Sequence, residues 1–273
     1  IDKKEELYKF RNSKYVQSEI GNCYCEIKEH LNRGKLVCFS GTSCQVEGLK
    51  NYLRKNYENL ILVDVVCRAV PSPLIWKKYL DMRQRQYRDI SRIMFRDKYY
   101  GYKYSNLSIY NKNNDKKQEY HKGVDSDPYL RAFFTNICDR PSCYDCKFKK
   151  LHRESDITIW DCFEVEKYNK NFDDDKGTSR ILVHTDKGRN IINLLNEKNR
   201  VEEIDVEKAF GDTFENGKRY QLFFVSEGEE PQRVDQGVRH VYTMQLAAVR
   251  KEDPDYDEIA QNEYLYACVL NTT

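Results

Sequence analysis

Short apolar runs alternate with amphipathic stretches over the first two-thirds of the chain. Lys35–Ser40 and Leu60–Val66 are strand-sized and almost continuously apolar, which is typical of strands buried on both faces. A helix is predicted over Cys23–Arg33, with Asn22 as its N-cap and Gly34 just past its end. Buried strands joined by helices indicate parallel pairing. The pattern therefore predicts the α/β class, with a mostly parallel, doubly wound sheet flanked by helices.

The remaining elements extend this sheet and add a β excursion, a smaller group of strands that lies apart from the main sheet. Further helices are predicted after the turn at residues 41–43, from Leu74, over Pro128–Ile137 and over Asp186–Asn196. The main sheet is expected to continue with Asp156–Trp160, Arg180–Thr185 and Val201–Val206. The excursion consists of shorter, more polar strands at Ser91–Arg96, Lys103–Tyr110 and Lys117–Lys122. Because the pattern weakens beyond Gly211, we expect one α/β domain over residues 1–210 and a helical extension over residues 211–273, with a helix at Gln236–Val249.

Charge and composition narrow the classes of partner. Lys and Arg total 46 against 44 Asp and Glu in 273 residues, so neither nucleic acid nor an anionic membrane is an expected partner. No apolar run reaches the roughly 18 residues of a membrane span, and the polar start Ile1-Asp-Lys-Lys-Glu-Glu has no signal-peptide core. We expect a cytoplasmic protein without a membrane span. The first residue is not methionine, which indicates a fragment of a longer chain.

The histidines and tyrosines predict no site of their own. The five histidines show no ligand spacing and are expected to be surface or polar packing residues. The 21 tyrosines are spread along the chain, which predicts no base-stacking platform. The candidate chemistry therefore lies with the ten cysteines.

Ten cysteines are many for a cytoplasmic chain, in which disulfides are rare. Cys143 and Cys146 form a C-x-x-C motif, and the basic stretch Lys147–Arg153 that follows favours their thiolates. Two thiolates at this spacing can hold one metal or cluster. The motif alone leaves zinc, redox and iron–sulfur roles open, together with chance pairing.

Two further cysteines follow the predicted strands. Cys44 begins a helix after the first strand, and Cys67 directly follows the second. Neighbouring parallel strands end at one rim of a sheet, where α/β folds bind ligands. Together with Cys143 and Cys146 these residues supply four sulfurs, the number that a [4Fe–4S] cluster or a zinc ion needs. The alternatives are a packing residue at Cys44 and a buried strand-end thiol at Cys67.

The turn formed by Ser40, Gly41, Thr42 and Ser43 places small residues where a strand passes into a helix. Backbone N–H groups and hydroxyls at such a helix N-terminus favour a phosphate. The turn matches neither the P-loop nor the G-x-G-x-x-G pattern, so an ordinary helix N-cap is the alternative.

Several motifs, taken together and in order, resemble the C-terminal family of the beta subunits of coenzyme F420 hydrogenases and dehydrogenases. The resemblance covers about Ser13 to Gly188. It rests on Ser13–Ser18 (SKYVQS), Phe39–Gln45 (FSGTSCQ) with Gly48–Lys50, Val65–Cys67 with Val70–Pro73, Phe95–Lys98 (FRDK), Arg140–Lys149 (RPSCYDCKFK), Ser155–Thr158 (SDIT) and Asp175–Ser179 (DKGTS).

The resemblance implies an α/β domain that binds a flavin, usually FAD, beside a [4Fe–4S] cluster. Such domains pass electrons between a donor, such as a reduced deazaflavin, and ferredoxin-type centres. The resemblance implies that the cluster ligands are Cys44, Cys67, Cys143 and Cys146. It also implies that the flavin lies along Ser13, Lys14, Ser18, Gly41 and Thr42, with Lys98 and Asp156 near its reactive side. Many relatives carry an upstream ferredoxin module, and some accompany polysaccharide-modifying enzymes.

The chain departs from the family pattern at two places. Arg68-Ala69 stand where relatives commonly have His-Gly. The run from Trp160 to Glu164 (WDCFE) stands where they commonly have Gly-Asp-Phe-Trp-Gly. The bulk of Trp160 and Glu164 either narrows the expected flavin site or removes it. Cys162, in the same run, is either an additional thiol at the redox site or a small buried packing residue.

We therefore predict an oxidoreductase that passes electrons between FAD and a [4Fe–4S] cluster. Its expected partners are a ferredoxin-type carrier or ferredoxin module and a small-molecule redox substrate. The candidate catalytic residues are Lys98, Asp156 and Cys162, and the candidate cofactor-binding residues are Ser13, Lys14, Ser18, Ser40, Gly41, Thr42 and Ser43. The alternative is a non-catalytic module, stabilised by zinc or a cluster, that docks a partner enzyme, for example in polysaccharide modification.

Overall fold

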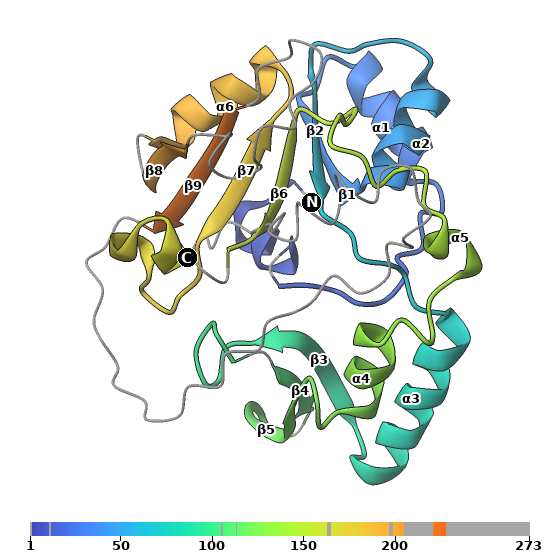
Figure 1. Cartoon of the computed structure of the whole chain (residues 1–273). Helices are drawn as coiled ribbons and strands as arrows, with labels where there is room; N and C mark the ends of the chain where they lie inside the picture. Colours follow the sequence, from blue (N-terminus) through green and yellow to red (C-terminus); the bar gives the residue numbers. More distant parts are fainter. Residues whose placement is uncertain are drawn as a thin grey trace. The chain divides into compact units, whose positions relative to one another are not determined.

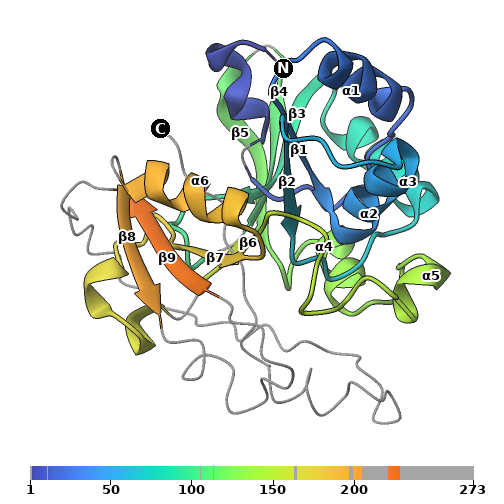
Figure 2. The ribbon, with the colours of Figure 1, turned by 90° about the horizontal axis from the view of Figure 1, so that it is seen from above.

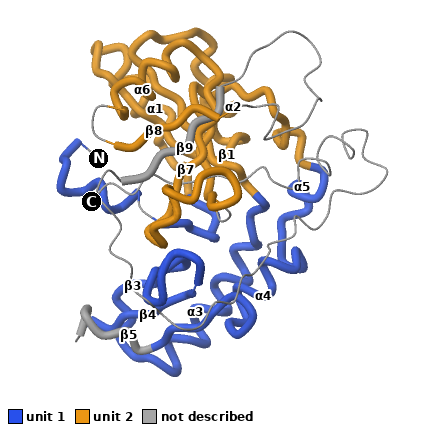
Figure 3. Tube along the Cα trace, turned by 60° about the vertical axis from the view of Figure 1, so that its left-hand side comes forward, with its two compact units in different colours: residues 1–18, 68–145, 234–247 blue, residues 19–67, 146–233, 248–273 orange. Residues whose placement is uncertain are grey.

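The computed structural model describes residues 2–10, 12–104, 106–112, 114–162, 165–196, 199–204 and 221–227. These residues form two compact units (Figure 3). Unit 1 takes in the described residues up to Ser18 and those from Arg68 to Asp145. Unit 2 takes in Glu19–Cys67 and the described residues from Cys146 onward. The chain therefore passes from one unit to the other after Ser18, after Cys67 and after Asp145.

Unit 2 is built around a six-stranded sheet with the order β1-β2-β6-β7-β9-β8 (Figure 1). Its strands are β1 (Val37–Thr42), β2 (Leu60–Val65), β6 (Ile157–Asp161), β7 (Ser179–Val183), β8 (Asn199–Ile204) and β9 (Gln221–Glu227). β1, β2 and β6 are parallel, whereas β7, β9 and β8 pair antiparallel with their neighbours. Two parallel strands are usually connected by an α-helix. The described part of the connection from β6 to β7 contains only the 3-10 turns η2 (Val165–Lys167) and η3 (Lys170–Phe172), in keeping with the antiparallel pairing of these two strands.

Helices cover opposite faces of this sheet (Figure 2). α1 (Cys23–Asn32) and α2 (Ser43–Leu53) pack on the face that carries Leu60 and Leu62 of β2. α6 (Asp186–Asn196) packs on the other face, against side chains of β6, β7 and β8 that include Ile157, together with Val63 of β2. Successive side chains of a strand point to opposite faces, so β2 contributes to both apolar cores.

Local sequence sets the junctions between these elements. Thr42 and Gln45 form a capping box at the start of α2, and Arg54 ends the same helix in the left-handed conformation with φ of 57°. Gly188 allows α6 to approach the sheet closely. A Cβ atom at Gly188 would lie 2.3 Å from the carbonyl oxygen of Asp156.

Unit 1 contains a smaller antiparallel sheet and its own aromatic core. The sheet has the order β3-β4-β5, formed by β3 (Ile90–Asp97), β4 (Asn106–Asn111) and β5 (Asn114–Gly123). The helical elements of the unit are η1 (Lys4–Phe10), α3 (Pro73–Gln86), α4 (Pro128–Phe134) and α5 (Pro141–Tyr144). Buried side chains of α3, α4 and the sheet form one cluster, in which aromatic rings predominate.

A buried carboxylate joins the elements of unit 1. One oxygen of Asp127 accepts two backbone N–H groups in the first turn of α4, which makes Asp127 the N-cap of that helix. The other oxygen accepts hydrogen bonds from Tyr79 at 2.7 Å, Tyr120 at 2.8 Å and Arg83 at 3.0 Å. The pKa of both tyrosine hydroxyls is raised, first by burial and then by this carboxylate. The hydroxyls therefore stay protonated and act as hydrogen-bond donors.

The predicted α/β class is confirmed, because helices flank the main sheet and the β excursion forms a separate small sheet. α6 spans the predicted residues, and β1 begins at Val37 rather than Lys35. The helix expected at Gln236–Val249 lies outside the described residues, and the described part of residues 211–273 is strand β9. The division at residue 210 stays a prediction. None of the described helices has the length and apolar character needed to cross a membrane.

Candidate functional site

The two strand-end cysteines lie at one rim of the unit 2 sheet. β1 and β2 are parallel neighbours, and their last residues, Thr42 and Val65, are register partners. Cys44 follows Thr42 by two residues, and Cys67 follows Val65 by two residues. Neither cysteine forms a disulfide; Cys44 is exposed and Cys67 is half-buried. The parallel register expected from the sequence therefore brings these two thiols to the same sheet edge.

The turn before α2 is shaped by the capping box. The side-chain oxygen of Gln45 accepts the backbone N–H of Thr42 at 2.9 Å, and the side chain of Thr42 accepts the N–H of Gln45. A Cβ atom at Gly41 would lie 2.9 Å from that Gln45 oxygen, so glycine leaves room for the returning side chain. The capping box uses two of the N-terminal N–H groups. Those of Ser43 and Cys44, the two positions between, are the ones left to face an anion.

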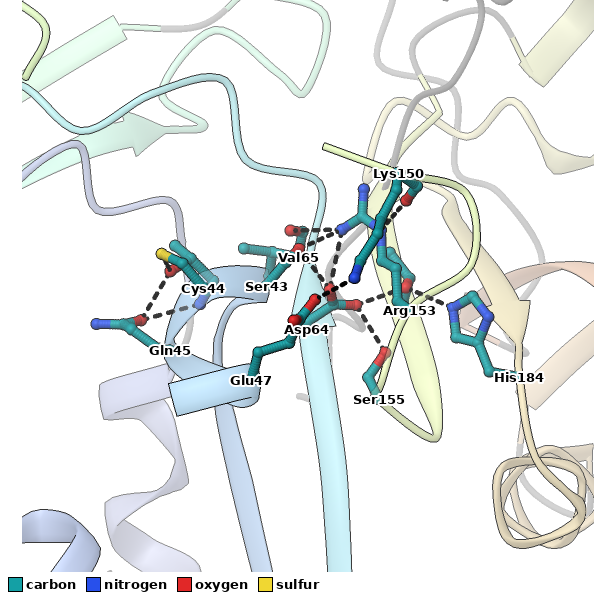
Figure 4. Close-up of polar contacts among 12 residues, drawn as sticks. Ser43, Cys44, Gln45, Glu47, Asp64, Val65, Lys150, Arg153, Ser155 and His184 are labelled. Carbon is teal, nitrogen blue, oxygen red and sulfur yellow. Dashed lines mark hydrogen bonds and ion pairs between the residues drawn. The ribbon is translucent and has the colours of Figure 1, made fainter. Parts of the chain in front are cut away.

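A buried carboxylate, Asp64 of β2, organises the polar contacts beside this turn (Figure 4). One oxygen accepts from the Ser43 hydroxyl at 2.6 Å and from Nη1 of Arg153 at 2.9 Å. The other accepts from the hydroxyl of Ser155 at 3.0 Å and from that of Thr158. Four donors, one of them charged, satisfy a carboxylate that has no access to water.

Arg153 links the start of α2 to the end of β2. Its Nη1 also donates to the Ser43 hydroxyl at 2.7 Å and to the carbonyl of Val65 at 3.3 Å. The Arg153 side chain is 12% exposed, so its positive charge reaches the rim beside the N-terminus of α2. A second cation, Lys150, lies nearby and pairs with Glu47 of α2 at 2.8 Å (Figure 4). The polar contacts that hold the turn therefore include two cationic side chains, those of Arg153 and Lys150.

His184 extends the network to the end of β7. Its Nε2 lies 2.8 Å from the hydroxyl oxygen of Thr158. A hydroxyl has one proton, and Thr158 donates it to Asp64, so Thr158 accepts the Nε2–H of His184. Burial lowers the pKa of His184 to about 4, against the attraction of Asp64, and the charge of Arg153 lowers it further. The imidazole is therefore neutral at physiological pH.

Comparison with known families identifies this part of the chain. The family described as the C terminus of the beta subunit of coenzyme F420 hydrogenase/dehydrogenase matches residues 34–209. The chain belongs to this family. None of the curated proteins matches the chain significantly. The family consists of hydrogenase and dehydrogenase subunits, which makes the chain an oxidoreductase-related subunit of an assembly with other subunits.

The matched region includes the rim and the whole Asp64 network, but the first three cofactor-binding candidates precede it. Ser13, Lys14 and Ser18 belong to unit 1, where the ammonium of Lys14 donates to the carbonyl of Asn12 at 3.3 Å. Lys98 also belongs to unit 1, with its ammonium 5.5 Å from the ring centroid of Tyr102. Their expected places along a flavin stay predictions.

Asp156 precedes β6 and is tied to its neighbours by both oxygens. One accepts the backbone N–H of Leu62 at 2.8 Å, and the other accepts the hydroxyl of Thr185 at 2.6 Å. The backbone N–H of Asp156 returns a bond to the carbonyl of Leu62 at 2.8 Å. These contacts join β2, β6 and the start of α6, and the expected place of Asp156 near a flavin stays a prediction.

Cys162 is completely buried just after β6. Its sulfur accepts the Nε–H of Arg180 at 3.2 Å, and its surroundings include Val165 and Phe172. Trp160, two residues earlier on the same face, is also buried, and its indole nitrogen has no hydrogen-bond partner among the described residues. Glu164 lies outside the described residues. The departure from the family pattern therefore places bulk and a buried thiol on the sheet face that carries Asp64.

The C-x-x-C motif follows α4. Cys143 lies in α5, where its N–H donates to the carbonyl of Arg140, and Cys146 is the first residue of the second segment of unit 2. Both thiols are free and half-buried. Within the described residues, no three or more His, Cys, Asp and Glu side chains are arranged to hold a metal ion. The shared site of four thiols stays a prediction.

Sequence reasoning missed Asp64 and Arg153 and assigned His184 only a packing role. The signal for Asp64 was present, because an acidic residue inside the apolar run LILVDVV requires buried partners. The partners themselves were not visible. Arg153 and His184 are 89 and 120 positions away from Asp64 along the chain, and the pairing of β2, β6 and β7 brings them together.

Proposed function

We propose that the chain is an electron-transfer oxidoreductase subunit that binds a flavin, FAD, and a [4Fe–4S] cluster and passes electrons between them. The observation that carries the proposal is the rim of unit 2. The thiols of Cys44 and Cys67 follow register partners of adjacent parallel strands, beside a helix N-terminus, inside the region matched by the family. Ligands of α/β sheets bind at such strand ends.

The turn at residues 40–43 is the proposed phosphate-binding element of the flavin site. The N–H groups of Ser43 and Cys44 favour an anion at the start of α2, and Arg153 adds a charge beside them. The Ser43 hydroxyl is already engaged by Asp64 and Arg153, so it orients the turn. Lys14, the remaining cationic candidate, would provide a second charge for the phosphates.

The four candidate ligands are cysteines, the residue type that binds iron–sulfur clusters. Cys44, Cys67, Cys143 and Cys146 form no disulfide, none is fully buried, and thiolates are the ligands that such clusters require. When bound, the flavin supplies the conversion between paired and single electrons, and the cluster carries single electrons.

The candidate residues near the proposed site have two different roles, positioning of the fold and contact with the flavin. Asp156 holds β2 and α6 in place with both oxygens, which favours a positioning role over proton transfer. Lys98 is the candidate for contact with the reactive ring. We propose a ferredoxin-type carrier as electron partner, a small-molecule redox substrate and a cytoplasmic location.

An absorption spectrum of the anaerobically purified and reconstituted chain tests the proposal. We expect flavin bands and a broad iron–sulfur shoulder, with about one FAD and four iron atoms per chain. Lys14→Ala should lower the FAD content, and the matched variant Lys28→Ala, in α1, should not. A colourless protein that contains stoichiometric zinc would reject the proposal in favour of a zinc-stabilised docking module.

A further inference from the structure

Unit 1 carries an exposed aromatic cluster that the proposed function does not use. It consists of Tyr99, Tyr100 and Tyr104 of the β3–β4 connection and His121 of β5, and we name it the tyrosine platform. The tyrosines are spread along the sequence, and His121 was expected to be a surface or polar packing residue. The β4–β5 hairpin returns His121 to the connection that carries three of these tyrosines, which the sequence pattern does not show.

The rings of the platform are held in a defined arrangement. Tyr99 and His121 are stacked, with ring centroids 4.8 Å apart and an interplanar angle of 28°. Tyr100 stands edge-on to Tyr99 at 4.7 Å and to Tyr104 at 5.2 Å. The Tyr100 hydroxyl is 3.0 Å from Nε2 of His121, which fixes the two elements to each other. Tyr99 is nevertheless 51% exposed and Tyr100 44% exposed, so large ring areas face solvent.

The connection that carries these rings is cationic. Lys98 and Lys103 lie within it, and its sequence has no acidic residue; Asp97 directly precedes it, and Arg96 of β3 is buried with its guanidinium 5.9 Å from the ring centroid of Tyr102. The carboxylate of Asp97 accepts a hydrogen bond from the Tyr110 hydroxyl at 2.7 Å. One of its oxygens is therefore engaged by a side chain of the same unit. Exposed rings ordered by stacking, with an excess of cations in the same short segment, complement a ligand that combines a flat ring with negative charge.

We propose that the tyrosine platform is a binding site for an anionic ligand of the nucleotide class. Its flat base stacks on the exposed ring of Tyr99, beside the perpendicular ring of Tyr100, and its phosphates face Lys103 of the connection. Aromatic side chains bind bases of any sequence in this way, because every base has a π-face. The site lies wholly in unit 1, so it requires no cofactor at the α2 turn of unit 2.

NADH, which has two bases and a pyrophosphate and is fluorescent, is the probe for this site. We expect the chain as purified to bind NADH with a dissociation constant below about 1 mM, and nicotinamide or inorganic pyrophosphate alone to bind more weakly. Tyr99→Ala should weaken NADH binding about tenfold, whereas Tyr99→Phe, which keeps the ring, should retain it. Tyr52→Ala is the matched control, since Tyr52 is 41% exposed and lies under the ammonium of Lys28 in unit 2.

Four outcomes would overturn the inference. NADH fails to bind, or Tyr99→Ala binds it as tightly as the unaltered chain while its circular dichroism is native. Tyr52→Ala weakens binding as much as Tyr99→Ala, which would indicate non-specific association. Tyr99→Ala loses FAD, which would assign the platform to the flavin site. If the unaltered chain contains neither flavin nor iron but still binds NADH, the proposed function is rejected and the tyrosine platform is not.

Discussion

The guanidinium of Arg153 lies 2.9 Å from the carboxylate of Asp64, and 89 residues of sequence separate the two. Their side chains are 12% and 1% exposed. The pair fixes the segment before β6 to the end of β2 and, through the Ser43 hydroxyl, to the first turn of α2. The shape of the proposed phosphate-binding turn therefore depends on an ion pair outside the turn.

Replacing Asp64 by Asn should destabilise unit 2 strongly. The variant keeps the size of the side chain and leaves the buried charge of Arg153 without its counter-charge, at a cost of about 3–5 kcal/mol. Urea unfolding followed by circular dichroism measures the loss. Glu154→Gln is the control, because it neutralises the exposed partner of Lys50 and should cost less than about 1 kcal/mol. Equal losses in the two variants would show that the Asp64 pair contributes nothing special.

Two glycine substitutions should differ in cost for a geometric reason. A Cβ at Gly41 meets the end of the flexible Gln45 side chain, which can swing away, so Gly41→Ala should cost about 1 kcal/mol through loss of the capping box. A Cβ at Gly188 meets the backbone carbonyl of Asp156, which cannot move without shifting α6 from the sheet. Gly188→Ala should therefore cost about 3 kcal/mol. Thermal unfolding of both variants checks the order, and the reverse order would refute the account.

Because of His184, we expect the protein to become less stable as the pH falls below neutrality. Burial lowers its pKa from 6.5 to about 4, so between these values the unfolded chain binds a proton that the folded chain does not. The stabilisation is fully present above pH 6.5 and is lost as the pH falls towards 4, by about 3 kcal/mol in total. Urea unfolding across this pH range measures the slope.

His184→Gln should remove this part of the slope, because glutamine keeps an N–H donor for Thr158 and does not titrate. His152→Gln, which replaces an exposed imidazole, should leave most of it. The interpretation fails if the pH dependence of His184→Gln matches that of the unaltered chain.

Iron content should separate the four proposed ligand cysteines from Cys162. Serine at Cys44, Cys67 or Cys143 should lower the iron bound per chain after anaerobic reconstitution, because each substitution removes one thiolate. Cys162→Ser should leave the iron count unchanged, since the Cys162 thiol is fully buried and is engaged by Arg180. A loss of iron in Cys162→Ser would make it a ligand, and full iron in Cys44→Ser would exclude Cys44 from the cluster.

Much of the scaffold could be read from periodicity. The apolar runs predicted β1 and β2 and their parallel pairing. Burial of β1 on both faces was wrong, because β1 is an edge strand in which Cys38 and Ser40 are exposed. The direction of β7 was not predictable in this way. Its five residues are all buried, as in a parallel strand, yet it pairs antiparallel with β6 and β9. Burial on two faces depends on which elements cover the sheet, and strand direction depends on the path of the connection.

Local sequence is sufficient to predict the α/β class, the strand-end positions of Cys44 and Cys67, and the small residues of the α2 turn. These follow from local rules, namely side-chain periodicity, helix capping and the rim at which parallel strands end. The contacts of Asp64 with Arg153, of Thr158 with His184, and of His121 with the tyrosines of its unit are visible only in the folded chain. Such contacts depend on strand order and register, which bring distant residues together and which no local pattern encodes.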